Sequence, residues 1–152
     1  MNEERYTEIQ TAADYLSFTF VSQGRHGNLT KIVRFDKLQS RGNTYNLALG
    51  TLLPDNSFDY ESTTNNGDRN KLLATVAIIV YVFMEEHPGY DVYITGSDYR
   101  RTLLYQRAIN YGYEDLIETF NIYGKLNHAN QGEFEPYDKS KYYYSGFLIG
   151  KK

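Results

Sequence analysis

Two adjoining stretches decide the fold: the polar Thr63-Thr64-Asn65-Asn66-Gly67-Asp68-Arg69-Asn70-Lys71 and the apolar Leu72-Leu73-Ala74-Thr75-Val76-Ala77-Ile78-Ile79-Val80-Tyr81-Val82-Phe83. Apolar residues recur in the second stretch at the i, i+3 and i+4 spacing of a helix, and its other side is apolar too. The β-branched residues would also suit a strand, but the run from about Asp68 to Glu86 is too long for one. We therefore predict a helix that is buried over most of its circumference and that fixes the polar turn in front of it.

Before this helix, alternating apolar residues predict an antiparallel meander. Strands are predicted at 15–22, 29–38 and 44–49, and 58–61 is predicted as a short strand or as the resumption of the third strand after a bulge. Lys31 interrupts the apolar face of the second strand, which Leu29, Val33 and Phe35 form.

After the helix, which His87-Pro88-Gly89 ends, the remaining elements alternate. The sequence predicts a strand at 91–95, a helix at 99–111 that Asp98 caps, further helical turns at 114–120, and strands at 121–124 and 142–149. The sequence thus predicts one α+β domain over residues 1–152. Its sheet is mostly antiparallel and carries a buried central helix and a second helix, in the order β-β-β-α-β-α-β.

Composition excludes several classes of function. The 152 residues carry a net charge of −3, so no basic excess indicates a nucleic-acid partner. The longest apolar run is shorter than the roughly 20 residues that span a bilayer, and no membrane association is expected. The chain has no cysteine, which fits the reducing cytoplasm. Sixteen tyrosines and no tryptophan indicate either an aromatic core with polar rims or an interaction surface.

A candidate site follows from topology. If the strand at 58–61 and the strand at 91–95 are parallel neighbours, both end at one edge of the sheet, where α/β proteins bind ligands. The turns at 63–68 and 96–98 would then flank one crevice.

The chemistry of these turns indicates an anion. Each turn opens a helix, where free backbone N–H groups and the helix dipole favour negative charge. Arginine side chains suit bidentate contact with phosphate. The candidate ligand-binding residues are Asn65, Asn66, Gly67, Asp68, Lys71, Ser97, Arg100, Arg101, Tyr105 and Arg107.

Other interpretations remain open from the sequence. The turns also read as ordinary helix caps, since neither matches a Walker A loop or Gly-x-Gly-x-x-Gly. Asp68, Asp98 and Glu61 would form an acid/base group or hold a divalent ion if they met in the crevice. The three histidines lack the spacing of a helical metal site, and no metal is predicted.

The two turns also carry a family resemblance. The motif Thr64-Asn65-Asn66-Gly67-Asp68-x-x-Lys71-x-Leu73-Ala74-Thr75-Val76-Ala77 and the motif Gly96-Ser97-x-x-Arg101-Thr102-x-Leu104-Tyr105-Gln106 resemble those of a bacterial family of uncharacterised small proteins, a domain of unknown function. The resemblance covers about residues 15–150. It implies no activity, but it marks both turns as signatures of the family.

A second resemblance concerns the fold alone. The order of meander, helix, strand, helix and strand is similar to the core of the acetyltransferases that bind coenzyme A, in which the turn before the first core helix holds the pyrophosphate. This chain has only Gly67 where that family has a glycine-rich turn. The leading expectation is therefore a small cytoplasmic bacterial protein that binds a phosphate-bearing, nucleotide-like ligand. The alternatives are an inhibitor-like or antitoxin-like interaction module that uses its tyrosines, and an acetyltransferase-like enzyme.

Overall fold

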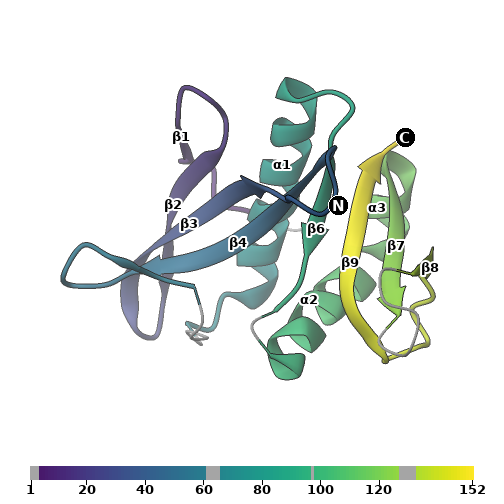
Figure 1. The fold of residues 1–152 in the computed structure, drawn as a ribbon. Coiled ribbons are helices and arrows are strands. Elements are labelled where there is room, and N and C mark those ends of the chain that lie inside the picture. The colour runs from purple at the N-terminus through teal and green to yellow at the C-terminus, as the bar shows by residue number, and fades with distance from the viewer. Residues whose placement is uncertain (1–3, 61–65, 97, 127–132) are drawn as a thin grey trace.

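The computed structural model describes residues 4–60, 66–96, 98–126 and 133–152. These residues form a mixed α+β fold with three helices and a nine-stranded sheet (Figure 1). The elements are β1 (Gln10–Thr11), β2 (Ser17–Gly24), β3 (Gly27–Lys37), β4 (Thr44–Leu52), β5 (Phe58–Asp59), α1 (Arg69–Glu86), β6 (Asp91–Ile94), α2 (Tyr99–Tyr111), α3 (Tyr113–Thr119), β7 (Phe120–Leu126), β8 (Phe134–Pro136) and β9 (Tyr144–Lys151).

The sheet is antiparallel except at its centre. Its strand order is β1-β2-β3-β4-β6-β9-β7-β8, with β5 paired to β4 outside this path. β4 and β6 are parallel neighbours, and their pairing runs from Thr44 opposite Asp91 to Leu47 opposite Ile94. Beyond Leu47 the pairing with β6 ends, and β4 is next paired on this side at Thr51 and Leu52, by β5.

The predicted partner of β6 is wrong. The sequence predicts that the strand at 58–61 pairs with the strand at 91–95. In the structure, β5 instead folds back on β4 and pairs with it antiparallel. The reversal occurs at Pro54-Asp55-Asn56, where Asn56 has a positive φ and the Leu53 amide donates to the Ser57 carbonyl over 2.8 Å. The strand that runs parallel to β6 is therefore β4, one strand earlier than the sequence prediction placed it.

The helices all lie on one face of the sheet, behind it in the view of Figure 1. α1 buries Val76, Ile79 and Phe83 against the sheet, and the Phe83 ring stacks on Phe35 of β3 with their centroids 4.0 Å apart. The opposite side of α1 is less covered than the sequence predicts. Leu72, Leu73, Ala77 and Ile78 there remain partly exposed. This incomplete cover leaves space beside the first turns of α1.

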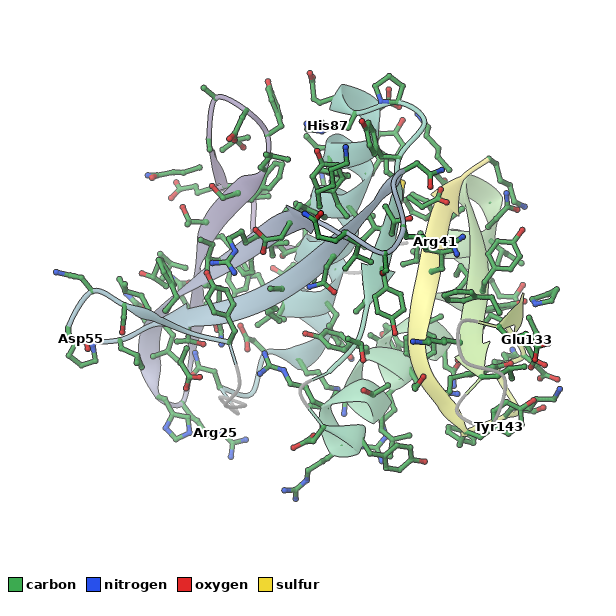
Figure 2. The ribbon with its side chains drawn as sticks, in the orientation of Figure 1. Arg25, Arg41, Asp55, His87, Glu133 and Tyr143 are labelled. Atoms are coloured by element: carbon green, nitrogen blue, oxygen red, sulfur yellow. The ribbon has the colours of Figure 1, made fainter. Side chains whose placement is uncertain are left out.

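The turn before α1 packs closely against the β2–β3 hairpin. The tip between β2 and β3 lies against Asn66, and a Cβ on Gly24 would sit 1.8 Å from the Asn66 carbonyl oxygen. Arg25 therefore lies at the end of the molecule where α1 begins, and His87 lies at the other end (Figure 2). The hairpin holds the turn before α1 in a fixed position.

Candidate functional site: a cation-lined cavity

A cavity of about 650 Å³ lies where α1 and α2 begin. Asn66, Gly67 and Asp68 of the first predicted turn line this space, whereas Gly96 and Asp98 of the second do not, and α2 contributes from Arg100 onward. Apolar side chains from both helices and from β4 form part of its wall: Leu49, Leu72, Leu73, Leu103 and Leu104.

Positive charge dominates the remaining wall. Among the described residues that line the cavity, the cations are Lys31, Arg69, Arg100, Arg101 and Arg107, and the one acid is Asp68. The chain as a whole is negative, with a net charge of −3. Positive charge is therefore concentrated at this cavity although the chain as a whole is negative. Such a concentration of positive charge generally raises the local concentration of anions.

Asn66 anchors the turn before α1. It is 2% exposed, and its side-chain amide donates to the Ser22 hydroxyl and to the Gly27 carbonyl over 3.0 and 3.1 Å. Its Oδ1 accepts from the backbone N–H of His26 over 2.7 Å. The side chain is committed to the β2–β3 hairpin, so Asn66 contributes to the cavity through its position and its backbone.

Asp68 occupies the N-cap position of α1, but its side chain does not cap the helix. Its Oδ2 accepts from the Tyr6 hydroxyl over 2.5 Å and from the Ser22 hydroxyl over 2.6 Å. The prediction that Asp68 caps its helix is therefore wrong. Because this carboxylate is engaged by Tyr6 and Ser22, it leaves the first-turn N–H groups of α1 for another acceptor.

The start of α2 is built differently. Asp98 caps it as predicted, since its Oδ1 accepts from the Arg101 backbone N–H over 2.8 Å. Gly96 is packed against this first turn, and a Cβ there would lie 2.4 Å from the Thr102 nitrogen. Gly96 therefore permits close approach of the helix itself. Asp98 is directed at its own helix, so it does not join Asp68 as an acid/base pair.

Arg101 joins α2 to the diverging edge of β4. Its side chain is 8% exposed, and its guanidinium donates to the Leu49 carbonyl over 2.8 Å and to the Tyr60 carbonyl over 2.7 Å. Leu49 lies two residues beyond the last residue of β4 that pairs with β6. Arg101 thus satisfies backbone groups that the sheet leaves open, and it also presents positive charge to the cavity.

Lys31 is a site residue that the sequence-based candidate set lacks. It is 4% exposed on β3, and its Nζ donates to the Thr51 hydroxyl over 2.7 Å. Burial lowers the pKa of Lys31 from its usual value of 10.5, because a low-dielectric surrounding disfavours the charged amine. The signal for it was visible in the sequence: a lysine within the apolar face of a strand is directed toward the core side.

Tyr105 closes the inner end of the cavity. It is 8% exposed on α2, and burial raises its pKa above 10.0, while the neighbouring Arg101 opposes this rise. A neutral phenol at this position can donate a hydrogen bond to a ligand at ordinary pH.

The other predicted residues divide into three groups. Gly67, Arg100 and Arg107 line the cavity, and so does Arg69, which the prediction omitted. Lys71 does not line it, because its Nζ lies 4.4 Å from the centre of the Tyr6 ring and 3.9 Å from Glu4. Asn65, Ser97 and Glu61 lie outside the described residues.

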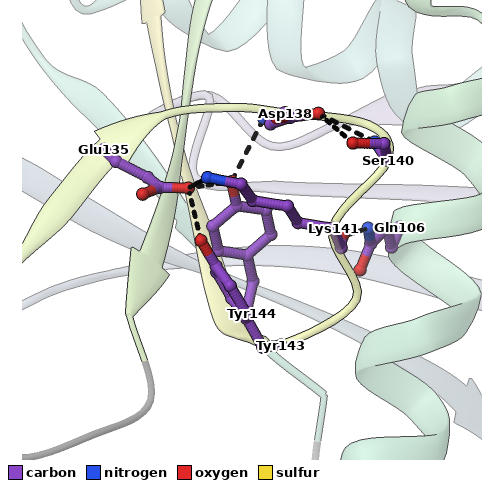
Figure 3. A network of polar contacts seen from close by, with 7 residues as sticks. All are labelled: Gln106, Glu135, Asp138, Ser140, Lys141, Tyr143 and Tyr144. Atoms are coloured by element: carbon purple, nitrogen blue, oxygen red, sulfur yellow. Dashed lines mark hydrogen bonds and ion pairs between the residues drawn. The ribbon is translucent and has the colours of Figure 1, made fainter.

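A second polar network lies away from the cavity, at the other side of α2 (Figure 3). The Glu135 carboxylate accepts from the Tyr144 and Tyr143 hydroxyls over 2.5 and 3.0 Å, and Lys141 lies 3.3 Å from it. Gln106 of α2 donates to the Lys141 carbonyl over 2.5 Å. This network fixes the segment before β9 to α2, so several tyrosines have a structural role.

Other tyrosines are exposed and form a surface. Tyr99, Tyr142 and Tyr143 are 56%, 52% and 43% exposed, and the Tyr99 hydroxyl donates to the Tyr142 carbonyl over 2.7 Å. We call these three residues the tyrosine surface. Tyr143 lies on the β8–β9 side of the molecule, far from Arg25 (Figure 2).

Two further features were searched for in the described part of the chain. No helix there is long and apolar enough to cross a membrane. Nowhere in the same residues do three His, Asp or Glu side chains gather as a metal ion would require.

Fold and cavity together define a class: an α+β protein with a cation-lined cavity at the start of two helices. The model of a family described as a family of unknown function, DUF6934, matches residues 2–152, and the chain belongs to this family. A search of the curated proteins and a search of the solved structures each gave no match.

Proposed function

We propose that this small protein, which we place in the bacterial cytoplasm, binds a phosphate-bearing small molecule in the cation-lined cavity. The observation that carries the proposal is the charge of the wall, in which the described residues are the cations Lys31, Arg69, Arg100, Arg101 and Arg107 and the carboxylate Asp68. Several phosphate oxygens can accept charge-assisted hydrogen bonds from such a set of donors.

The first turns of both helices support the same reading. Neither α1 nor α2 has an acidic residue in its first turn, and α1 begins with Arg69 while α2 begins with Tyr99 and Arg100. A cation at the positive end of a helix dipole costs about 0.3 to 1 kcal/mol. An anion bound between the two helix starts offsets this cost, and the N–H groups at the start of α1, which the Asp68 side chain does not cap, offer it donors.

The ligand is larger than inorganic phosphate. A volume of about 650 Å³ lies within the range of about 300 to 1,000 Å³ that is usual for small-molecule sites, and leucines form much of the wall. A nucleotide or coenzyme A combines phosphate groups with a part that can pack on such side chains. These two classes are therefore the first ligands to test.

The experiment is a calorimetric titration of pyrophosphate, ATP, ADP and coenzyme A into the wild type, Arg100→Ala and Arg107→Ala. Both arginines are exposed, so their loss leaves the fold intact. We expect each substitution to weaken binding about tenfold, because each removes a charge-assisted contact.

The matched control is Arg41→Ala. Arg41 is exposed, its guanidinium lies 5.1 Å from the centre of the Phe134 ring, and it does not line the cavity. Its affinity should equal that of the wild type. If no probe binds the wild type, or if Arg41→Ala weakens binding as much as Arg100→Ala does, the proposal is wrong.

A second candidate function is protein interaction through the tyrosine surface. The exposure of Tyr99, Tyr142 and Tyr143 favours it, because tyrosine is enriched at interface cores. Its test is co-purification from native cells with the wild type and with the Tyr142→Ser variant. A partner retained equally by both variants would contradict a role for this surface.

Acyl transfer is a third candidate. The parallel pair β4 and β6 with α1 between them, and a turn before α1 that borders the cavity, suit the order of elements that the sequence shares with the coenzyme A-binding acetyltransferases. Coenzyme A release from acetyl coenzyme A in the presence of amine acceptors tests it. Turnover that Tyr105→Phe leaves unchanged would exclude Tyr105 as the proton donor.

A further inference from the structure

A second, apolar hollow of about 70 Å³ opens behind the cation-lined cavity. It lies between α1, α2, the start of α3 and the strands beneath them. Among its described lining residues, none is charged, and most are aliphatic. Among the lining residues of the two long helices are three alanines, Ala74 and Ala77 on α1 and Ala108 on α2.

The two spaces adjoin one another. Leu73 and Tyr105 line both the charged cavity and the apolar hollow. Leu73 is partly exposed, whereas Tyr105 is 8% exposed, so the boundary between the two spaces consists of one leucine and one aromatic ring. A molecule whose anionic group lies among the arginines therefore has the apolar hollow within its reach.

We propose that the ligand of the charged cavity carries a short apolar arm, acyl or alkyl, which enters the hollow past Leu73 and Tyr105. This rests on the proposed function, because the anionic group is what holds the arm at the entrance. An apolar hollow that water fills poorly is stabilised when hydrocarbon occupies it.

The size of the hollow limits the arm. A dry apolar cavity of about 150 Å³ accepts benzene, and this one has about half that volume. It has room for about three consecutive carbon atoms. Burying one methylene group gains about fourfold in affinity. The affinity should therefore rise about fourfold for each carbon that enters the hollow, over about three carbons. Chains too short to reach the hollow should show no gain, and carbons beyond those that fill it should add none.

Calorimetric titration of two series of probes tests this inference. One series consists of inorganic phosphate and the straight-chain alkyl phosphates from methyl to octyl phosphate. The other consists of coenzyme A and its straight-chain acyl thioesters from acetyl to octanoyl. The series that shows the stepwise gain tells whether a simple phosphate ester or a thioester carries the arm.

Two variants fill the hollow from different helices, Ala108→Leu on α2 and Ala77→Leu on α1. Both residues are only partly buried, which leaves room for the larger side chain. We expect each variant to lose the gain with chain length and to keep the affinity of the shortest probe. Ala13→Leu, at an exposed position before β2, is the matched control and should retain the gain.

The outcomes separate the two proposals. If the shortest probes bind and affinity does not depend on chain length, the apolar arm is refuted while the anion site stands. If Ala108→Leu and Ala77→Leu are folded and keep the wild-type dependence, the hollow is not where the arm binds, and the inference is also refuted. If no member of either series binds, the anion site itself fails and the arm fails with it.

Discussion

The two helices that begin at the cavity differ in how their first turns are satisfied. In α2 the Asp98 carboxylate accepts from the helix's own backbone, at 2.8 Å from the Arg101 nitrogen. In α1 the equivalent carboxylate, Asp68, accepts from Tyr6 and Ser22 instead. A completed cap satisfies a helix terminus internally, whereas a diverted one leaves donors for a ligand. On this comparison we base the proposal that an anion binds at the start of α1 and that the start of α2 supports it.

The same contrast exists between the two arginines that open α2. Arg100 is exposed at the cavity, whereas Arg101 is buried and holds two backbone carbonyls. The two adjacent arginines thus differ in role: Arg100 is available to the proposed ligand, whereas Arg101 stabilises the fold.

The largest expected effect comes from Arg101→Ala. The substitution leaves the Leu49 and Tyr60 carbonyls without their donor in a partly buried place, and we expect a loss of about 2 kcal/mol in the free energy of unfolding. Unfolding in urea measures it. Arg100→Ala should change this free energy by less than about 0.5 kcal/mol. Equal losses in the two variants would break the distinction between them.

A smaller effect is expected from Asp98→Ala. It removes the side-chain cap of α2 and should lower the free energy of unfolding by about 1 kcal/mol, while Asp98→Asn, which retains a capping oxygen, should recover most of it. Urea unfolding of both variants is the measurement. If the asparagine variant is as unstable as the alanine variant, capping is not the role of Asp98.

Replacing Asp68 should strengthen anion binding, whereas replacing Arg100 or Arg107 should weaken it. Asp68 is the one acid among the described residues of the cavity wall. Asp68→Asn removes its charge and should tighten the binding of pyrophosphate about threefold, as expected for one like charge at several ångströms in a largely aqueous site. Calorimetry at fixed ionic strength measures the change. Weaker binding in this variant would indicate that the ligand is not an anion, or that Asp68 holds it directly.

The smallest effect concerns the network that joins α2 to the segment before β9 (Figure 3). The hydrogen bond from Tyr144 lowers the pKa of Glu135 below its usual 4.5. A lowered carboxyl pKa stabilises the fold above the unfolded value, and this contribution is lost as the pH falls through the folded value. Tyr144→Phe should therefore flatten the decline in stability below about pH 4.5, measured by urea unfolding across the acid range. An unchanged decline would show that Glu135 does not contribute.

Much of the fold was predictable because local pattern and tertiary structure agree. The helical spacing from Leu72 to Met84 and the alternation in the first three strands predict α1 and β2 to β4 to within a few residues. The pairing of β6 was not predictable from the same signals. Whether Phe58 continues the sheet or folds back depends on the turn at Asn56, whose positive φ the sequence permits but does not require.

The site was predictable in part for a related reason. Turn residues and basic residues near helix starts mark where an anion would bind, and Gly67, Arg100 and Arg107 do line the cavity. The direction of a side chain is set by tertiary packing, so the sequence did not reveal that Lys71 lies over Tyr6 or that Asp68 is diverted from its helix. Lys31 was detectable as a charge on an apolar strand face, but its cavity exists only once α1 and α2 are in place.

The most direct test of the anion site is a nuclear magnetic resonance titration of the isotope-labelled protein with pyrophosphate, read at the backbone amides of both helix starts. We predict the largest shifts at Gly67, Asp68, Arg69 and Asn70, with the Arg101 amide, which Asp98 already satisfies, changing little. Shifts that are largest at the start of α2, or that are absent from the start of α1 while pyrophosphate binds elsewhere, would contradict the account.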